Sequence, residues 1–290
     1  MVKKNGEVNS PFRYAGGKFY ARKLILAHVP THKHYVEPMC GGASIFFAKH
    51  KSEKSFLNDL DKELVNCLIH IRDCPEKIAD FLKDIPASKE KHNFFKNEFK
   101  PKNDLERAAR WFYLNRTSYS GIMNMKNCFW GYGDKYSMRP ENWRRHLLAT
   151  SAKLRNVDIT NKDFQKVIED APDGSFTFLD PPYFNRDQDK FYTFSFSKED
   201  HRRLAETLKK HSNRIKFLLT YDDEPEVREL YGWAKHILSK EWNYTIYRTD
   251  DQSKNGDNQA SKSNGKRYKG QEIFILNYGN GDELNSKLVL

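Results

Sequence analysis

The stretch FTFLDPPY, residues 176–183, is the strongest indication of fold in this sequence. Its first half, Phe176 to Leu179, is an apolar run of strand length, and Asp180 follows directly at its end. Open α/β sheets place their ligands and reactive side chains at the carboxyl ends of the strands. The stretch therefore predicts a strand that delivers a carboxylate to a site. The alternative is an ordinary strand-ending turn, in which Asp and Pro are common.

The four residues Asp180, Pro181, Pro182 and Tyr183 suit chemistry on an exocyclic amine of a nucleobase. The lone pair of such an amine is delocalised into the ring, so two hydrogen-bond acceptors are needed to localise it. The Asp180 carboxylate and the Pro181 carbonyl can accept the two N–H hydrogens. Consecutive prolines stiffen the backbone, and Tyr183 offers a flat face to a base. We therefore predict that these four residues are catalytic.

A second pattern lies nearer the N-terminus. Residues 35–47, YVEPMCGGASIFF, are typical of a strand, a tight glycine turn and an apolar helix, an arrangement that lets a nucleotide-like ligand approach the backbone. Asp59 stands eighteen positions after Gly41, at the end of another strand-like run, where an acid can bind ribose hydroxyls. Two glycines alone are explained equally well by a simple loop. Together with Asp59 and the later Asp180, they favour a nucleotide-like ligand.

With these motifs in this order, the chain resembles the S-adenosylmethionine-dependent DNA adenine-N6 methyltransferases of the alpha-type motif order. In that group the cofactor motif precedes the target-recognition region, and Asp-Pro-Pro-Tyr follows it. Residues 11–18, PFRYAGGK, resemble the family's N-terminal motif, and residues 115–121, NRTSYSG, resemble its Asn-Arg segment. Asp163 and Phe164 are placed like the pair that holds the cofactor's adenine. Ala43 stands where many relatives carry a second glycine, which predicts slightly tighter cofactor geometry there.

The resemblance implies an α/β fold: a Rossmann-like methyltransferase mixed sheet with an inserted, mainly helical target-recognition domain that carries a hairpin. Residues 10–72 and 155–280 are expected to form the catalytic, cofactor-binding domain, and residues 73–154 the DNA-binding domain. The residues expected to bind S-adenosyl-L-methionine are Tyr14, Ala15, Gly16, Gly17, Lys18, Glu37, Pro38, Gly41, Gly42, Ala43, Ser44, Asp59, Asp163, Phe164 and Asp180.

The segment between the two catalytic parts has a different composition. Stretches 75–82, 89–99, 105–114 and 142–154 have helix-like apolar spacing, whereas 124–139 is rich in Gly and aromatic residues and predicts a hairpin or an ordered loop. Residues 72–146 hold 16 Lys and Arg against 10 Asp and Glu, an excess that suits DNA contact; a helical lid with solvated charges is the alternative. The residues expected to contact DNA are Arg116, Tyr119, Asn124, Lys126, Lys135 and Arg139.

Composition limits the kind of partner, the cellular location and the state of the cysteines. The formal net charge of +11 favours a polyanionic partner. The sequence contains no apolar stretch of membrane-spanning length and no signal-peptide core, so we expect a cytoplasmic protein, encoded by a bacterium or a phage. Without a C-x-x-C pair, the cysteines are expected to be reduced thiols that bind no metal and form no disulfide. They are Cys40, Cys67, Cys74 and Cys128.

The function expected from these patterns is site-specific methyl transfer from S-adenosyl-L-methionine to N6 of an adenine flipped out of duplex DNA. A cytosine-N4 methyltransferase would use the same electronics, but such enzymes more often resemble Ser-Pro-Pro-Tyr. Enzymes that modify glutamine N5 or RNA usually have Asn first in the tetrapeptide. A noncatalytic DNA-binding module would be expected to lose Asp180 or the glycine turn, and a nicotinamide-dependent dehydrogenase has no use for Asp-Pro-Pro-Tyr. The recognition sequence, a restriction partner and the oligomeric state are left open.

Overall fold

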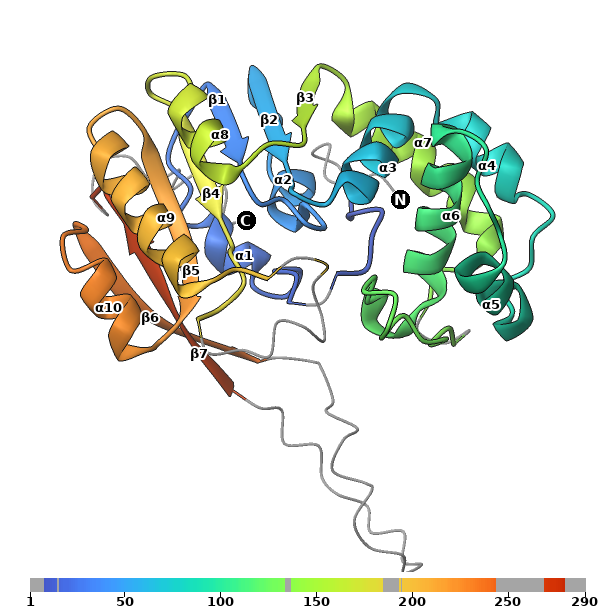
Figure 1. Ribbon diagram of the computed structural model, residues 1–290. Coiled ribbons are helices and arrows are strands. Elements are labelled where there is room, and N and C mark those ends of the chain that lie inside the picture. Colours follow the sequence, from blue (N-terminus) through green and yellow to red (C-terminus); the bar gives the residue numbers. More distant parts are fainter. Residues whose placement is uncertain are drawn as a thin grey trace, which may run out of the picture.

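The computed structural model describes residues 8–14, 16–133, 137–184, 193, 195–243 and 269–279. A twisted sheet with helices on its faces forms one side of the molecule, and a group of helices forms the other side (Figure 1). Within the described residues, no helix is both long enough and apolar enough to cross a membrane.

The sheet has seven strands in the order β3-β2-β1-β4-β5-β7-β6. The first five in this order are parallel, and β7 pairs antiparallel with both β5 and β6. Because β2 and β4 lie on opposite sides of β1, the strand order reverses there, which is where open α/β sheets bind ligands. The strands are β1 His34–Glu37, β2 Lys54–Asn58, β3 Val157–Thr160, β4 Phe176–Leu179, β5 Lys216–Asp222, β6 His236–Asn243 and β7 Lys269–Leu276.

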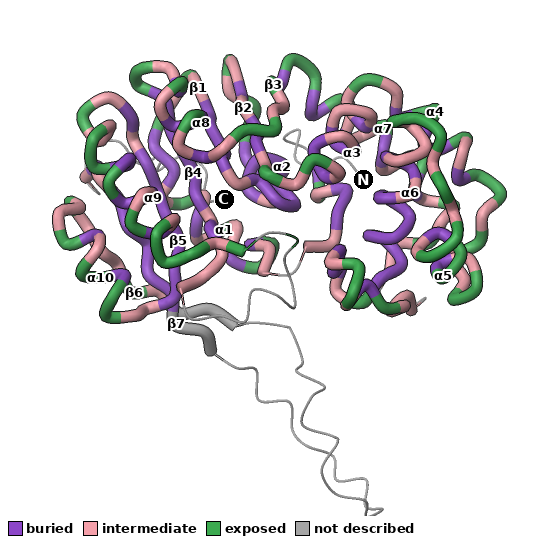
Figure 2. The backbone as a smooth tube through the Cα atoms, in the orientation of Figure 1, coloured by how far each residue is buried: buried purple, intermediate pink, exposed green. Residues whose placement is uncertain are grey.

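The central strands are buried because helices cover both faces of the sheet. All four residues of β4 are buried, and only Lys216 of β5 is partly exposed (Figure 2). Strands buried on both faces are continuous apolar runs, whereas apolar and polar residues alternate in the strands of a sheet that has one face exposed to solvent. Burial of Phe176 and Phe178 contributes roughly 2–3 kcal/mol each. The strand predicted from the stretch FTFL is therefore confirmed, and it ends directly before Asp180.

Three of the helices beside the sheet, α3, α8 and α9, begin with a side-chain cap. The side chain of Ser197 accepts a hydrogen bond from the Asp200 backbone N–H, and Asp200 accepts one from the Ser197 backbone, which is a complete capping box at the start of α9. Leu204 and Leu208, four residues apart, bury one face of this helix. The helices in this part are α1 Arg22–Leu26, α2 Ser44–Ala48, α3 Lys62–Asp73, α8 Phe164–Asp170, α9 Lys198–His211 and α10 Pro225–Leu230.

The inserted segment is mainly helical, as predicted. Its central helix, α6, is buried along most of its length, with Phe112 and Tyr113 fully enclosed. Its hydrophobic residues belong to one cluster with those of α3 and one face of the sheet, so the insert is not packed as a separate core. The elements are α4 Pro75–Leu82, α5 Lys89–Asn97, α6 Asp104–Thr117, η1 Tyr119–Gly121, η2 Pro140–Asn142 and α7 Trp143–Leu154.

The hairpin expected for residues 124–139 is not found as a pair of strands in the part of the chain that the structure describes. An isolated antiparallel bridge joins Ser118 to Trp130, and the Tyr119 N–H donates to the Phe129 carbonyl at 2.8 Å. Ser120, with φ of 52°, turns the chain sharply after this bridge and prevents an extended strand. The described residues of this segment, 124–133 and 137–139, form a loop, the alternative that the composition also allowed.

Candidate active site and cofactor pocket

The turn after β1 is shaped by the ring of Tyr14. Gly41 has φ of +44°, and a Cβ atom there would lie 2.7 Å from a ring carbon of Tyr14, so only glycine fits. Ala43 also adopts the left-handed region, with φ of 48° and ψ of 37°. A non-glycine residue in that region costs roughly 1–2 kcal/mol. Ala43 therefore keeps the backbone path of a glycine at the cost of some strain.

Asp59 holds this turn from the neighbouring strand. One carboxylate oxygen accepts a hydrogen bond from the Gly41 N–H at 2.8 Å, and the other accepts one from the Asp61 N–H at 2.9 Å. Burial raises the pKa of Asp59 to about 6, although the two N–H groups act in the opposite direction. The carboxylate thus fixes the glycine turn as well as bordering the pocket.

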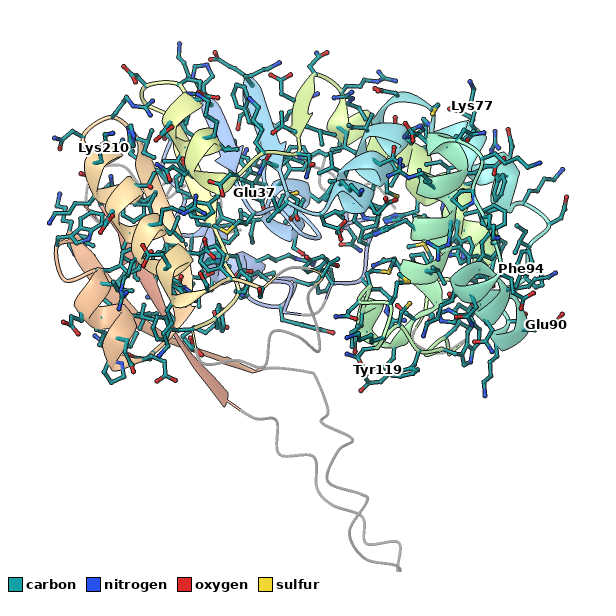
Figure 3. The ribbon with its side chains drawn as sticks, in the orientation of Figure 1. Glu37, Lys77, Glu90, Phe94, Tyr119 and Lys210 are labelled. Carbon is teal, nitrogen blue, oxygen red and sulfur yellow. The ribbon has the colours of Figure 1, made fainter. Side chains whose placement is uncertain are left out.

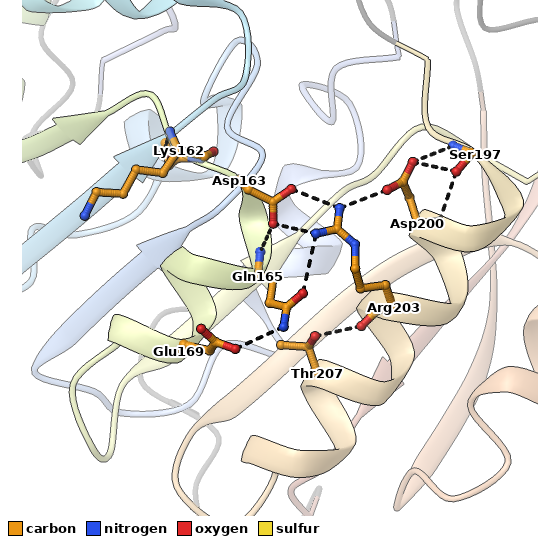
Figure 4. Close-up of polar contacts among 9 residues, drawn as sticks. Lys162, Asp163, Gln165, Glu169, Ser197, Asp200, Arg203 and Thr207 are labelled. Carbon is orange, nitrogen blue, oxygen red and sulfur yellow. Dashed lines mark hydrogen bonds and ion pairs between the residues drawn. The ribbon is translucent and has the colours of Figure 1, made fainter.

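Asp163 and Phe164 lie at the start of helix α8, and Arg203 of α9 contacts both; Figure 4 shows its ion pair with Asp163. The Arg203 guanidinium donates to the two Asp163 oxygens at 2.8 and 2.9 Å, and its central carbon lies 4.4 Å from the centre of the Phe164 ring. Asp200 accepts a further hydrogen bond from Arg203 at 2.9 Å. Sequence reasoning missed Arg203 and Asp200. The capping-box spacing locates the start of their helix, but no local signal shows a partner 40 residues away.

Asp180 lies at the carboxyl end of β4, as predicted, with 21% of its side chain exposed. The Lys18 ammonium contacts its two oxygens at 2.7 and 2.9 Å, and the Thr220 hydroxyl donates to it at 2.8 Å. Lys18 Nζ lies 4.9 Å from the centre of the Tyr183 ring and 3.9 Å from a carboxylate oxygen of Glu272. The structure thus brings the N-terminal motif and the Asp-Pro-Pro-Tyr motif together. The place of Glu272 in this group was not predicted.

Glu37, at the end of β1, is a buried acid with 2% of its surface exposed (Figure 3). It accepts a hydrogen bond from the Tyr35 hydroxyl at 2.9 Å. The pKa of Glu37 is raised to about 8, mainly by burial and also by the nearby Asp180 charge, although the hydrogen bond from Tyr35 acts in the opposite direction. At neutral pH this side chain therefore carries a proton for most of the time.

A single pocket is bordered by most of the residues predicted to bind a cofactor. Those that line it are Tyr14, Gly16, Gly17, Lys18, Glu37, Pro38, Gly41, Gly42, Ala43, Ser44, Asp59, Asp163, Phe164 and Asp180. Ala15 lies outside the described residues. Of the predicted catalytic residues, Asp180 and Pro182 also line it. Lining residues that the sequence did not indicate are Met39, Cys40, Ile45, Leu60, Asp61, Lys162, Phe178, Thr193, Ser195, Phe196, Asp200 and Arg203.

The predicted DNA contacts fall into two classes. Tyr119 is 43% exposed on the lower side of the helical part in Figure 3, and Lys126 and Arg139 are also exposed. Asn124 is half-buried, and its side-chain oxygen accepts a hydrogen bond from the Lys126 N–H at 3.0 Å. Lys135 lies outside the described residues.

The expectation that Arg116 contacts a phosphate or a base edge is wrong for this conformation, because the residue is 6% exposed. Its guanidinium donates to the Pro11 carbonyl at 3.5 Å, a long hydrogen bond. Burial lowers the pKa of Arg116 to about 10, and the neighbouring Arg13 charge acts in the same direction. A basic residue type in a DNA-binding segment does not show on which face of a helix the side chain lies.

Asn115, the neighbour of Arg116, has a role that the sequence did not indicate. Its side-chain oxygen accepts from the Arg13 N–H at 2.9 Å, and its side-chain nitrogen donates to the Arg13 carbonyl at 2.8 Å. Gly121 packs against the same carbonyl, since a Cβ atom there would lie 2.2 Å from the oxygen. These contacts, which we call the Arg13 clamp, join the N-terminal motif to the loop that carries Tyr119.

Among the residues that the structure describes, no group of three or more His, Cys, Asp or Glu side chains is arranged to hold a metal ion. The four cysteines are free, and three of them are buried.

Comparison with known proteins shows which family and which relatives the chain resembles. A family model, D12 class N6 adenine-specific DNA methyltransferase, matches residues 14–246. The chain is 27% identical to the type II methyltransferase M1.LlaDCHI of Lactococcus lactis subsp. cremoris, covering 97% of this chain and 99% of that protein. It is 29% identical to the type II methyltransferase M.CviBI of Paramecium bursaria Chlorella virus NC1A, covering 81% and 91%.

Among solved structures, a precorrin-8W decarboxylase of Methanobacterium thermoautotrophicum covers 95% of this chain and 98% of its own length, with a TM-score of 0.39 and 11% identity. That likeness is too weak to bear on function. The family match covers most of the chain and agrees with the Rossmann-like methyltransferase sheet and with Asp180 at its edge. The chain therefore belongs to the D12 class N6 adenine-specific DNA methyltransferases, and it is an adenine-specific DNA methyltransferase.

Proposed function

We propose that the protein transfers a methyl group from S-adenosyl-L-methionine to N6 of an adenine that is flipped out of a specific short site in duplex DNA. The observation that carries this proposal is the position of Asp180. It borders the same pocket as the glycine turn, Asp59 and Asp163, so an acceptor for an amine and the candidate cofactor residues share one space.

The pocket has the donor and acceptor groups that this cofactor needs. Gly41 and Gly42 let the Tyr14 ring pack directly against the backbone, and all three residues border the pocket. Asp59 supplies an acidic side chain suited to ribose hydroxyls, and Phe164 supplies an aromatic face suited to the adenine ring, beside the Asp163 carboxylate. When bound, S-adenosyl-L-methionine supplies a methyl group that its positively charged sulfur has already activated.

The residues after β4 would act on the target base. The Asp180 carboxylate and the Pro181 carbonyl accept the two N6–H hydrogens, and Tyr183 stacks on the ring. The new N–C bond would form as the methyl C–S bond breaks with its electron pair leaving on sulfur, and N6 would release one proton, to the Asp180 carboxylate or to water. Extruding the base from the stack costs a few kcal/mol. Positioning of the amine supplies much of the acceleration.

The exposed loop residues would bind the duplex. Lys126 and Arg139 present positive charge suited to phosphates, and Tyr119 offers a ring that can stack on a base or wedge between bases. Lys135 is proposed to join them on the basis of its sequence position. Both curated relatives described above are named type II methyltransferases, which supports a role in restriction-modification. The reaction would take place where its DNA substrate lies, in the cytoplasm of a bacterium or of a phage-infected host.

The test is incubation of the protein with methyl-labelled S-adenosyl-L-methionine and unmethylated plasmid DNA, followed by nucleoside analysis. N6-methyl-2′-deoxyadenosine is the expected labelled product, and Asp180→Ala should abolish it. Label in N4-methyl-2′-deoxycytidine would contradict the choice of base, and label in neither nucleoside would contradict the function. Base-resolution sequencing of the same DNA would identify the recognition site.

A further inference from the structure

A second acid lies behind the reactive carboxylate. Glu272, on the antiparallel strand β7, is 1% exposed, and strand pairing sets it opposite Asp222 of β5. Neither of its carboxylate oxygens has a partner at full hydrogen-bonding geometry, although the Tyr183 hydroxyl lies close enough to lower its pKa. A buried carboxylate without hydrogen bonds is costly unless an opposite charge is near. The Lys18 ammonium, 3.9 Å from one Glu272 oxygen, supplies that charge.

Lys18 is thus shared by two carboxylates. It is itself 5% exposed, contacts both oxygens of Asp180 and donates to the Gly16 carbonyl at 3.2 Å. Lys18 lies 2.7 Å from one Asp180 oxygen, which also accepts a hydrogen bond from the Thr220 hydroxyl at 2.8 Å, and 2.9 Å from the other, so both oxygens already face protein donors. A substrate amine must compete with them. The Lys18 charge also holds electron density on Asp180 and weakens its acceptance of an N6–H hydrogen.

We propose that Glu272 is a positioning residue for methyl transfer: it is the alternative counterion that draws Lys18 away from Asp180 when the target amine arrives. A charged N–H···O contact is typically about 2.7–2.9 Å long, so Lys18 has to move by only about 1 Å to form one with Glu272. The inference rests on the proposed function, since it assumes that Asp180 accepts from the amine.

The ionisation of Glu272 makes the inference measurable. Burial raises the pKa of Glu272 to about 7. The Asp180 and Asp222 charges raise it further, whereas the Lys18 charge and the Tyr183 hydroxyl lower it. Only the ionised form can draw Lys18 away. The increase in the rate of methyl transfer that Glu272 provides should therefore be small below pH 6 and complete above pH 8.

The first test compares wild type with Glu272→Gln, which keeps the shape and removes the charge. Single-turnover methyl transfer at saturating S-adenosyl-L-methionine and DNA should fall by roughly tenfold to a hundredfold at pH 8, the scale expected when a preorganised electrostatic group is lost. The affinities for cofactor and DNA should change less than about twofold. The ratio of the wild-type rate to the variant rate should rise with pH through about 7. Glu229→Gln, at an exposed position, is the matched control and should leave the ratio at one at every pH.

A double-mutant cycle tests whether Glu272 acts through Lys18. In a Lys18→Met background, Glu272→Gln should cause no further loss, because the cation that it draws away is missing. If Glu272→Gln fails to fold, Glu272→Asp keeps the charge, and the ratio of the wild-type rate to its rate should not rise with pH. A Gln variant with the wild-type rate and pH profile would overturn the inference alone. The same loss in both backgrounds would also overturn it. Wild type that transfers no methyl to DNA would overturn the proposed function, and this inference with it.

Discussion

Replacing Gly121 by alanine separates two ways in which a glycine can be required. Gly121 has φ of +72°, and a Cβ atom would lie 2.2 Å from the Arg13 carbonyl oxygen. Gly174 has nearly the same φ, +71°, but nothing lies within 4 Å of its Cβ position. Gly174→Ala therefore introduces only the left-handed backbone strain, which is roughly 1–2 kcal/mol. Gly121→Ala introduces the same strain together with a clash.

The size of the clash term follows from the contacts. Real Cβ atoms do not approach closer than 3.0 Å, so the Arg13 carbonyl must move away from position 121. That movement disturbs the two hydrogen bonds between Asn115 and the Arg13 backbone. Each contributes about 1 kcal/mol, and a buried group left unpaired costs about 1–3 kcal/mol. We expect Gly121→Ala to lower the free energy of unfolding by about 2–4 kcal/mol more than Gly174→Ala does.

The measurement is urea unfolding of the two variants and wild type at one pH, followed by circular dichroism and by tryptophan fluorescence. Gly133→Ala, where a Cβ atom would meet nothing within 4 Å, gives the baseline for an added methyl group. Equal losses of unfolding free energy for Gly121→Ala and Gly174→Ala would refute the reasoning. They would mean that the Arg13 clamp can accommodate a methyl group without a measurable loss of stability.

Three further outcomes are expected. Asp180→Asn should bind DNA as wild type does but transfer methyl more slowly by roughly two orders of magnitude in single turnover, and near-wild-type transfer would exclude Asp180 as the partner of the amine. Arg116→Met should leave the slope of log DNA affinity against log salt unchanged, because a buried guanidinium releases no phosphate counterion, whereas a shallower slope would restore the phosphate contact. The pKa of Asp59 is raised from 3.8 to about 6, so the stability that its protonated form gives is complete below pH 3.8 and lost as the pH rises through about 6. The Asn in Asp59→Asn cannot ionise, so the variant does not lose this stability as the pH rises. Its free energy of unfolding minus that of wild type should therefore be about 1 kcal/mol greater at pH 8 than at pH 5. The exposed control Asp84→Asn should show no such difference.

The parts of the site that could be predicted from sequence are those in which a strand and its adjoining turn are continuous in the chain. The run before Asp180, the glycine turn at Gly41 and the acid at Asp59 each combine an apolar strand pattern with a residue suited to the strand end. Their shared pocket then follows from the parallel sheet, because its strands end at one edge.

The parts that could not be predicted depend on distant partners. Arg203 meets Asp163 across 40 residues, and Glu272 reaches Lys18 only because β7 inserts between β5 and β6. The expectation that Arg116 contacts DNA follows from its place in the NRTSYSG segment, whereas its burial depends on how α6 packs. The loop expected as a hairpin has the composition of one, but the left-handed Ser120 turns the chain before strands can pair.

The Arg13 clamp also bears on how target specificity can be exchanged among such enzymes. Asn115 lies in the inserted segment, whereas Arg13 lies 102 residues earlier in the chain, beside the cofactor motif. A chimera that receives residues 73–154 from a relative would place a foreign loop against the native Arg13 backbone. The insert also shares its hydrophobic cluster with α3 and the sheet. A chimera should therefore fold and function only when residues 8–14, the buried face of α3 and the insert are all taken from the same relative.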